Sequence, residues 1–317
     1  MQTDPVLVTG PIRSGTTYVG RVLSESGYWA YLDEPCNVTN GIEGIHLWFP
    51  YVSEFPESET SRQHKYALDG LMNGRFTYKT PPNPDHGSFR KQLKKWLGGR
   101  SAWMGYRYKL LERFYKPVLI KDPTALPSSG YLSNTYGMKV IFLIRHPAAF
   151  YMSMKKQQWD FDFNNLLQQK ELCENLLQDY TDEIKQNPKS YIDRIALLWK
   201  VLAGIERQIL ENQIKSRGFK ITHEALCLEP METMQQVFDF LEIPLNNKVR
   251  QFIIRTTSSE KTDAEEGKVH DFFRDSRRLA WGWKQKITEE ERDRIREVTE
   301  NEAAHHYPDS TWSLGEV

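Results

Sequence analysis

The stretch LVTGPIRSGTTYVGRVL, Leu7–Leu23, has the residue types and spacing of a phosphate-binding loop. Gly10, Gly15 and Thr17 fit the pattern G-x-x-x-x-G-x-[ST]. Glycines let a chain wrap closely around an anion, and the amides at the start of the next helix point at it. Thr16 stands where a loop that binds a nucleoside triphosphate has its lysine. The loop therefore lacks the charge that reaches the outer phosphates.

The side chains of this loop favour a single phosphate held without a metal. Ser14, Thr16 and Thr17 supply hydroxyl donors, and Arg13 supplies a fixed positive charge. The most apolar segment, KVIFLIR, ends at Arg145 and not at an acid that would ligate Mg²⁺. The competing interpretation is that the glycines only form a turn between a strand and a helix.

A second anion site is predicted at the end of the KVIFLIR segment. Arg145 comes at the carboxyl end of this predicted strand, and Ser153 lies on the helix that follows. Ligands of open α/β sheets bind outside the carboxyl ends of the strands. An arginine and a hydroxyl there can bind a second phosphate, although Arg145 can instead cap a helix or pair with an acid. Two such sites together suit a nucleotide with phosphates at its 5′ and 3′ ends.

Strand patterns alternate with helix patterns along the chain, which predicts an α/β fold with a central parallel sheet flanked by helices. We expect strands at Val6–Thr9, Trp29–Tyr31, Pro117–Asp122, Lys139–Arg145 and Phe219–Leu226. We expect helices at Thr16–Ser26, Phe89–Leu97, Ser190–Arg217, Pro230–Leu241 and Glu289–Ala304, and a mostly helical segment at Phe161–Gln186. Residues 1–317 are interpreted as a single P-loop-like domain, with about 40–115 and 158–190 as substrate-loop or lid elaborations.

Composition narrows the class of ligand and the compartment. Lys plus Arg and Asp plus Glu both number 42, so the net charge is zero and a nucleic-acid partner is disfavoured. Cys36, Cys173 and Cys227 form no CxxC or metal-ligand pattern, which indicates free thiols in a reducing compartment. No apolar run reaches the length of a membrane span. We expect a cytoplasmic protein with no metal and no membrane association.

Four segments resemble motifs of the sulfotransferase family, which uses 3′-phosphoadenosine-5′-phosphosulfate (PAPS). GPIRSGTTYV resembles its 5′-phosphosulfate loop, and RHPAAFYMS resembles its 3′-phosphate motif. ITHEALCLEP is similar to its Tyr-Glu-x-Leu segment, and WGWKQKI is similar to its C-terminal Trp-Lys segment. The resemblance implies metal-free transfer of a sulfuryl group to a hydroxyl or amine of a small molecule, with 3′,5′-diphosphoadenosine (PAP) as product.

The resemblance also implies roles for individual residues. Those implied to hold the 5′-phosphate are Arg13, Ser14, Gly15, Thr16 and Thr17, and those implied to hold the 3′-phosphate are Arg145 and Ser153. Arg277 or Arg278 would add a late basic contact to the 3′-phosphate. His223 stands where the family often has a tyrosine that stacks on adenine, and Lys121 would reach the leaving phosphate. Arg13 is also implied to stabilise charge on the bridging oxygen.

The general base departs from the pattern of many cytosolic members. These have a histidine in the strand that corresponds to IKDP, where this chain has Asp122. Glu34 resembles the glutamate base of the carbohydrate-modifying branch and is our first candidate. His46 is the second candidate because imidazole titrates near neutral pH. Asp122 is the third.

The acceptor is less constrained by the sequence. YWAYLDEP and DFDFNN interleave aromatic and acidic residues, which motivates the hypothesis of a cationic or polar small metabolite. The alternative is that the rings belong to the core and the acids are solvated. A kinase-like P-loop enzyme and a non-catalytic nucleotide-binding module remain alternatives for the function, and a homodimer is left open.

Overall fold

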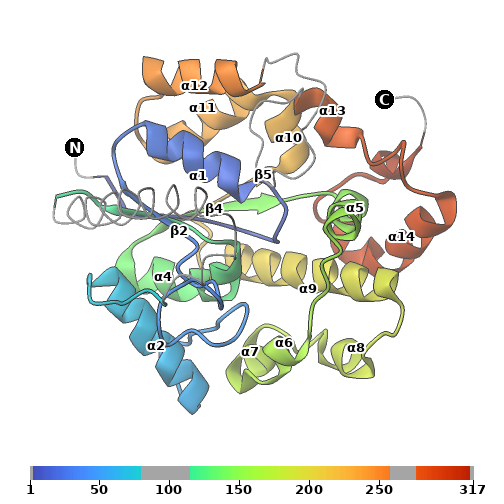
Figure 1. The fold of residues 1–317 in the computed structure, drawn as a ribbon, viewed down its shortest axis with the longest axis horizontal. Coiled ribbons are helices and arrows are strands. Elements are labelled where there is room, and N and C mark those ends of the chain that lie inside the picture. The colour runs from blue at the N-terminus through green and yellow to red at the C-terminus, as the bar shows by residue number, and fades with distance from the viewer. Residues whose placement is uncertain (1–2, 80–114, 258–275, 315–317) are drawn as a thin grey trace, which may run out of the picture.

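A parallel sheet of five strands forms the centre of the protein, which we describe from a computed structural model over residues 3–79, 115–257 and 276–314 (Figure 1). Its strands are β1 (Val6–Thr9), β2 (Ala30–Asp33), β3 (Val118–Lys121), β4 (Lys139–Ile144) and β5 (Gly218–Thr222). They lie in the order β2-β3-β1-β4-β5, and every neighbouring pair is parallel. The predicted single domain with a central parallel sheet is confirmed.

Helices cover both faces of the sheet, because the strands are apolar on both sides. Val6 and Val8 of β1 pack in one buried cluster, and Leu7 packs in the other. One face is covered by α1 (Thr16–Glu25), α11 (Pro230–Phe240) and α12 (Asn247–Thr257) (Figure 1). The other face is covered by α4 (Ser129–Tyr136) and α9 (Tyr191–Asn212) (Figure 1).

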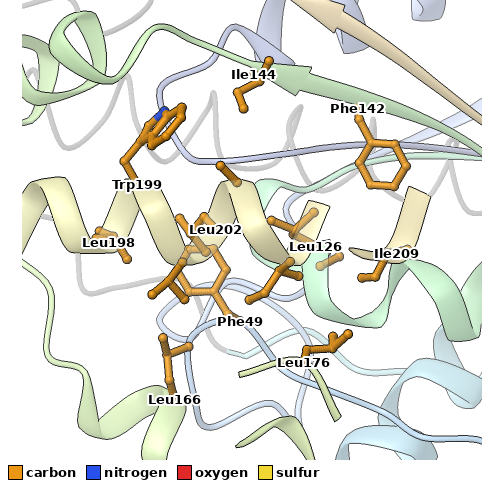
Figure 2. Close-up of a cluster of buried hydrophobic side chains, with 14 of the residues drawn as sticks. Phe49, Leu126, Phe142, Ile144, Leu166, Leu176, Leu198, Trp199, Leu202 and Ile209 are labelled. Carbon is orange, nitrogen blue, oxygen red and sulfur yellow. The ribbon is translucent and has the colours of Figure 1, made fainter. Parts of the chain in front are cut away.

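The larger core lies around α9, the long helix beneath the sheet. Figure 2 shows α9 between Phe142 of β4 on one side and Phe49 and Leu166 on the other. Trp199 and Phe49 are among the largest fully buried side chains. The helix thus joins the sheet to the segments after β2 and α5.

The remaining helices surround these layers. They are α2 (Glu59–Met72), η1 (Pro123–Ser128), α5 (Pro147–Gln157), α6 (Asn164–Leu167), α7 (Lys170–Asn175), α8 (Thr181–Gln186), α10 (His223–Leu228), α13 (Ser276–Trp281), α14 (Glu289–Ala303) and η2 (Asp309–Trp312). Within the described ranges, no helix is long and apolar enough to cross a membrane.

One predicted strand needs correction. The predicted strand Phe219–Leu226 ends at Thr222, whose hydroxyl accepts the Ala225 amide and caps α10. The predicted elaboration 40–115 contains α2, which begins where the Ser58 hydroxyl accepts the Ser61 amide. The segment Phe161–Gln186, predicted to be mostly helical, contains α6, α7 and α8. The predicted helix 89–97 and part of the 40–115 elaboration lie outside the described residues.

Glu206 of α9 is a fully buried carboxyl group in the core. Neither of its oxygens has a hydrogen-bond partner among the described residues. Burial raises its pKa to about 8, while the charge of Lys220 opposes the rise and that of Glu302 adds to it. The folded protein therefore holds a proton on Glu206 that the unfolded chain releases at lower pH.

Glu206→Gln is expected to flatten the pH dependence of stability. In the wild type, Glu206 contributes a loss of stability as the pH rises from about 4.5 to about 8, because the folded state binds more protons than the unfolded state there. Thermal unfolding across this pH range measures the slope. The control is Glu211→Gln on the same helix, whose side chain is 57% exposed. Parallel curves for wild type and Glu206→Gln would contradict the prediction.

Candidate functional site

The carboxyl ends of the parallel strands meet at one edge of the sheet, and predicted site residues from every strand end lie there. The loop 10–15 follows β1, Glu34 follows β2, Lys121 ends β3, Arg145 follows β4 and His223 follows β5. Residues distant in sequence are thus brought together where open α/β sheets bind ligands.

The loop between β1 and α1 lies directly against β4. A Cβ atom at Gly10 would stand 2.1 Å from the carbonyl oxygen of Leu143, and φ of Gly10 is 134°. Arg13 and Gly15 also have positive φ, at 65° and 101°. Gly15 is the N-cap residue of α1, so no side chain caps the first turn. Such alternating backbone conformations direct successive amides towards an anion.

The two predicted anion sites are adjacent. Nε of Arg13 donates to Oγ of Ser153 on α5 over 3.0 Å. Nη1 of Arg145 donates to the carbonyl oxygen of Arg13 over 3.2 Å. Trp159, which is 42% exposed, lies against the Arg13 guanidinium with 5.2 Å from Cζ to the ring centroid. Two guanidinium groups and a hydroxyl therefore gather at the crest of the loop.

The guanidinium group of Arg145 has a buried N–H group that can still donate a hydrogen bond. Its Nε is buried and has no hydrogen-bond partner in the part of the chain that the structure describes. Burial lowers its pKa, whereas the negative charge of Glu224 opposes this. Arginine remains charged in proteins, so a buried donor on a cation can bind an anion.

His223 stands beneath the loop. Its Cδ2 would lie 3.4 Å from a Cβ atom at Gly15, and its Nδ1 lies 3.4 Å from Sγ of Cys227. Burial lowers the pKa of His223 well below its usual value, and the charges of Arg145 and Arg13 act in the same direction. The imidazole is therefore neutral beside the two guanidinium groups.

A buried lysine joins the carboxylates at the end of β2. Nζ of Lys121 lies 2.6 Å from Oε1 of Glu34 and 2.8 Å from Oδ1 of Asp33. Burial opposes the charge on Lys121, but the two carboxylates hold its pKa above the ordinary value. Asn37 donates to the other oxygen of Glu34 over 3.3 Å. The ammonium thus forms ion pairs with both acids.

Asp33 is the member of this group that sequence reasoning missed. It pairs with Lys121 in the parallel register of β2 and β3. The Tyr31 hydroxyl donates to its Oδ1 over 3.0 Å. The only signal in the sequence was its place directly before Glu34, two residues after the predicted strand Trp29–Tyr31.

The other two candidate bases differ from Glu34 in their surroundings. Asp122 is fully buried, and its oxygens accept the amides of Cys36 and Thr124 over 2.6 and 2.9 Å. Burial raises its pKa to about 6. These bonds join the loop after β2 to the start of η1, so Asp122 has a structural role here. His46 is exposed in that loop, near the buried His64, whose pKa is lowered to about 4 by burial.

The aromatic segments YWAYLDEP and DFDFNN have partners within the fold. Trp29 is buried and donates to the Asp4 carbonyl over 2.8 Å. Asp160 forms an ion pair of 2.7 Å with Arg194. Phe161 packs edge-on against Phe49. These three side chains are therefore engaged in contacts within the fold. The side chains of Arg277 and Arg278 lie outside the described residues.

Comparison with known proteins identifies one matching family. The profile of the Sulfotransferase family matches residues 5–247, more than half of the chain. No functionally curated protein matches the sequence. Over the described ranges, no group of three or more His, Cys, Asp or Glu residues is arranged to hold a metal ion.

Several solved structures are similar to this chain. A sulfotransferase domain from the curacin biosynthetic pathway has 13% identity and a TM-score of 0.46, covering 94% of this chain and 98% of that one. A domain from the olefin synthase of Synechococcus PCC 7002 has 16% identity and a TM-score of 0.43, with 97% of both chains covered. A mouse sulfotransferase complexed with PAP has 12% identity and a TM-score of 0.43, covering 99% of this chain and 88% of that one.

Gly10→Ala is expected to destabilise the protein more than Gly27→Ala. Both residues have positive φ, but a Cβ atom at Gly27 meets nothing within 4 Å. Gly27→Ala should therefore cost only the left-handed backbone penalty of about 1–2 kcal/mol. Gly10→Ala adds the collision with the Leu143 carbonyl. Urea unfolding of both variants tests this, and equal losses of stability would show that the contact between loop and strand can relax.

Proposed function

Because this chain belongs to the sulfotransferase family, we propose that it transfers a sulfuryl group from PAPS to a hydroxyl or amine of a small-molecule acceptor. The observation that carries the proposal is the meeting of Arg13, Ser153 and Arg145 at one edge of the sheet. A donor with two separate phosphates needs two adjacent anion sites, and this group supplies the cations for both.

The residues at this edge fit the chemistry of such a donor. The 5′-phosphate would lie at the loop, against Ser14, Gly15, Thr16 and Thr17. The 3′-phosphate would lie at Arg145 and Ser153, where the buried Nε of Arg145 has no hydrogen-bond partner in the described part of the protein. The neutral ring of His223 lies beside Gly15 and would stack on adenine. Arg277 or Arg278 would complete the 3′-phosphate contact.

When bound, PAPS supplies a sulfuryl group that carries less charge than a γ-phosphoryl group, so side chains and amides can balance it. A bond forms between sulfur and the acceptor oxygen or nitrogen, and the bond between sulfur and the phosphate oxygen breaks. PAP leaves with the bonding electrons. Arg13 stabilises the charge that develops on the phosphate side.

We propose that Glu34 is the general base that takes the proton from the acceptor. Its side chain is 37% exposed at the open edge of the sheet, where an acceptor can reach it. Lys121 and Asn37 each bind one of its oxygens and so fix the carboxylate in place. Because Asp33 also contacts Lys121, Glu34 is not the sole counter-ion of that ammonium. This carboxylate is therefore fixed in orientation at the open edge, as a general base has to be.

The wider proposal follows the same interpretation of the sequence. The domain would extend over residues 1–317, with about 40–115 and 158–190 shaping the acceptor side. The acceptor would be a polar small molecule, and the protein would act in the cytoplasm without a metal.

Calorimetric titration tests the donor. PAP should bind without Mg²⁺, and about tenfold or more tightly than ATP, because only PAP offers a 3′-phosphate to Arg145. Each nucleotide is titrated with and without Mg²⁺. A preference for ATP that requires Mg²⁺ would contradict the proposal and favour a kinase-like enzyme.

Glu34→Gln tests the base. Glutamine can still accept the Lys121 hydrogen bond, so the fold and PAP affinity should be unchanged. Turnover of radiolabelled PAPS with a panel of alcohols, phenols and amines should fall by about 10²–10⁴-fold. The matched variant is His46→Gln in the exposed loop, which should retain activity. The reverse result, with His46→Gln inactive and Glu34→Gln active, would transfer the role to His46.

A further inference from the structure

The peptide unit that joins Arg145 to His146 is held on both sides by side chains from distant segments. Nε1 of Trp199 donates to the carbonyl oxygen of Arg145 over 2.7 Å. The amide of His146 donates to Oε1 of Glu224 over 3.1 Å. This unit follows the last residue of β4, so it lies beyond the hydrogen bonds of the sheet. The orientation of this peptide unit therefore depends on these two contacts. It in turn sets the direction of the Arg145 side chain.

Glu224 is itself held by the C-terminal segment. Its other oxygen, Oε2, accepts the Tyr307 hydroxyl over 2.8 Å, and both residues are buried. Burial raises the pKa of Glu224, whereas the His146 amide, Arg145 and Tyr307 oppose the rise. Tyr307 lies outside residues 5–247, the part that matches the family profile.

Aromatic rings of the same segment enclose His146. Trp283 stacks on its ring with centroids 4.7 Å apart and an interplanar angle of 14°. Tyr307 and Trp312 meet it edge-on at 5.0 and 4.5 Å. Burial lowers the pKa of His146 to about 3, so the ring is neutral and adds no charge beside Arg145. The residue after Arg145 is thereby locked to the C-terminal segment 276–314.

We propose that Glu224 and Tyr307 are positioning residues that orient Arg145 towards the 3′-phosphate of the donor. An arginine binds phosphate well only when its planar group is held in the correct direction. Glu224 provides this through the backbone, because its Oε1 accepts the amide of His146, the residue after Arg145. The inference rests on the proposed function, since it assumes that the donor carries a 3′-phosphate.

Tyr307→Phe is the test, with Tyr180→Phe as its matched control. Each variant removes one buried hydrogen bond from a tyrosine to a glutamate, because the Tyr180 hydroxyl donates to Glu302 over 3.0 Å. Calorimetry with PAP and with AMP, which lacks the 3′-phosphate, separates the two phosphate sites. Tyr307→Phe should weaken PAP binding by about three- to tenfold and change AMP binding by less than about twofold. Tyr180→Phe should leave both affinities unchanged.

Two variants at Glu224 supply a second readout. Glu224→Gln keeps an acceptor for the His146 amide and removes a negative charge near Arg145, so PAP should bind at least as tightly as to the wild type. Glu224→Ala removes the acceptor, so PAP affinity should fall. Rescue by glutamine but not alanine supports positioning through the backbone.

Each contrary result has a distinct meaning. If Tyr307→Phe weakens PAP and AMP equally, or acts no differently from Tyr180→Phe, the positioning role is overturned. If the wild-type protein does not prefer PAP to AMP, the proposed donor fails, and this inference fails with it. Circular dichroism melting of each variant confirms that the affinities are measured on folded protein.

Discussion

The contact between the loop after β1 and the end of β4 determines how the site is assembled. Gly10 lies so close to the Leu143 carbonyl that a Cβ atom on residue 10 would stand 2.1 Å from the carbonyl oxygen. This approach brings Arg13 within hydrogen-bond range of Ser153 and of the Arg145 side chain. A parallel sheet whose neighbouring strands end at one edge makes the approach available, and the absence of a Cβ atom makes it sterically allowed.

Charge is distributed unevenly along this edge although the whole chain is neutral. Asp33 and Glu34 lie at the end of β2, Lys121 lies beside them, and the two arginines lie at β1 and β4. The proposed transfer would use the acidic end to accept a proton and the basic end to stabilise an anion. A group transfer needs both at once, separated by a short distance.

The sequence predicted most of what depends on local pattern. The glycine loop, the strand directly before Arg145 and the helix that carries Ser153 were all recognisable from residue types and spacing. The start of α10 was not, because FKITHEAL has the composition of a strand and only the Thr222 cap ends it. The bond between Glu224 and Tyr307 joins residues 83 apart, so no local signal could reveal it. Asp33 likewise depends on the register of two strands far apart in sequence.

The contacts that hold the Arg145–His146 peptide unit have a consequence for the order in which a growing chain acquires structure. β1 to β4 are complete once residue 144 has been synthesised, whereas the partners of His146 come from Glu224, Trp283, Tyr307 and Trp312. Until these residues leave the ribosome, the imidazole and the end of β4 lack their cover. The nascent protein therefore exposes an apolar surface at the end of β4 until Trp312 has been translated, and such surface is prone to aggregation.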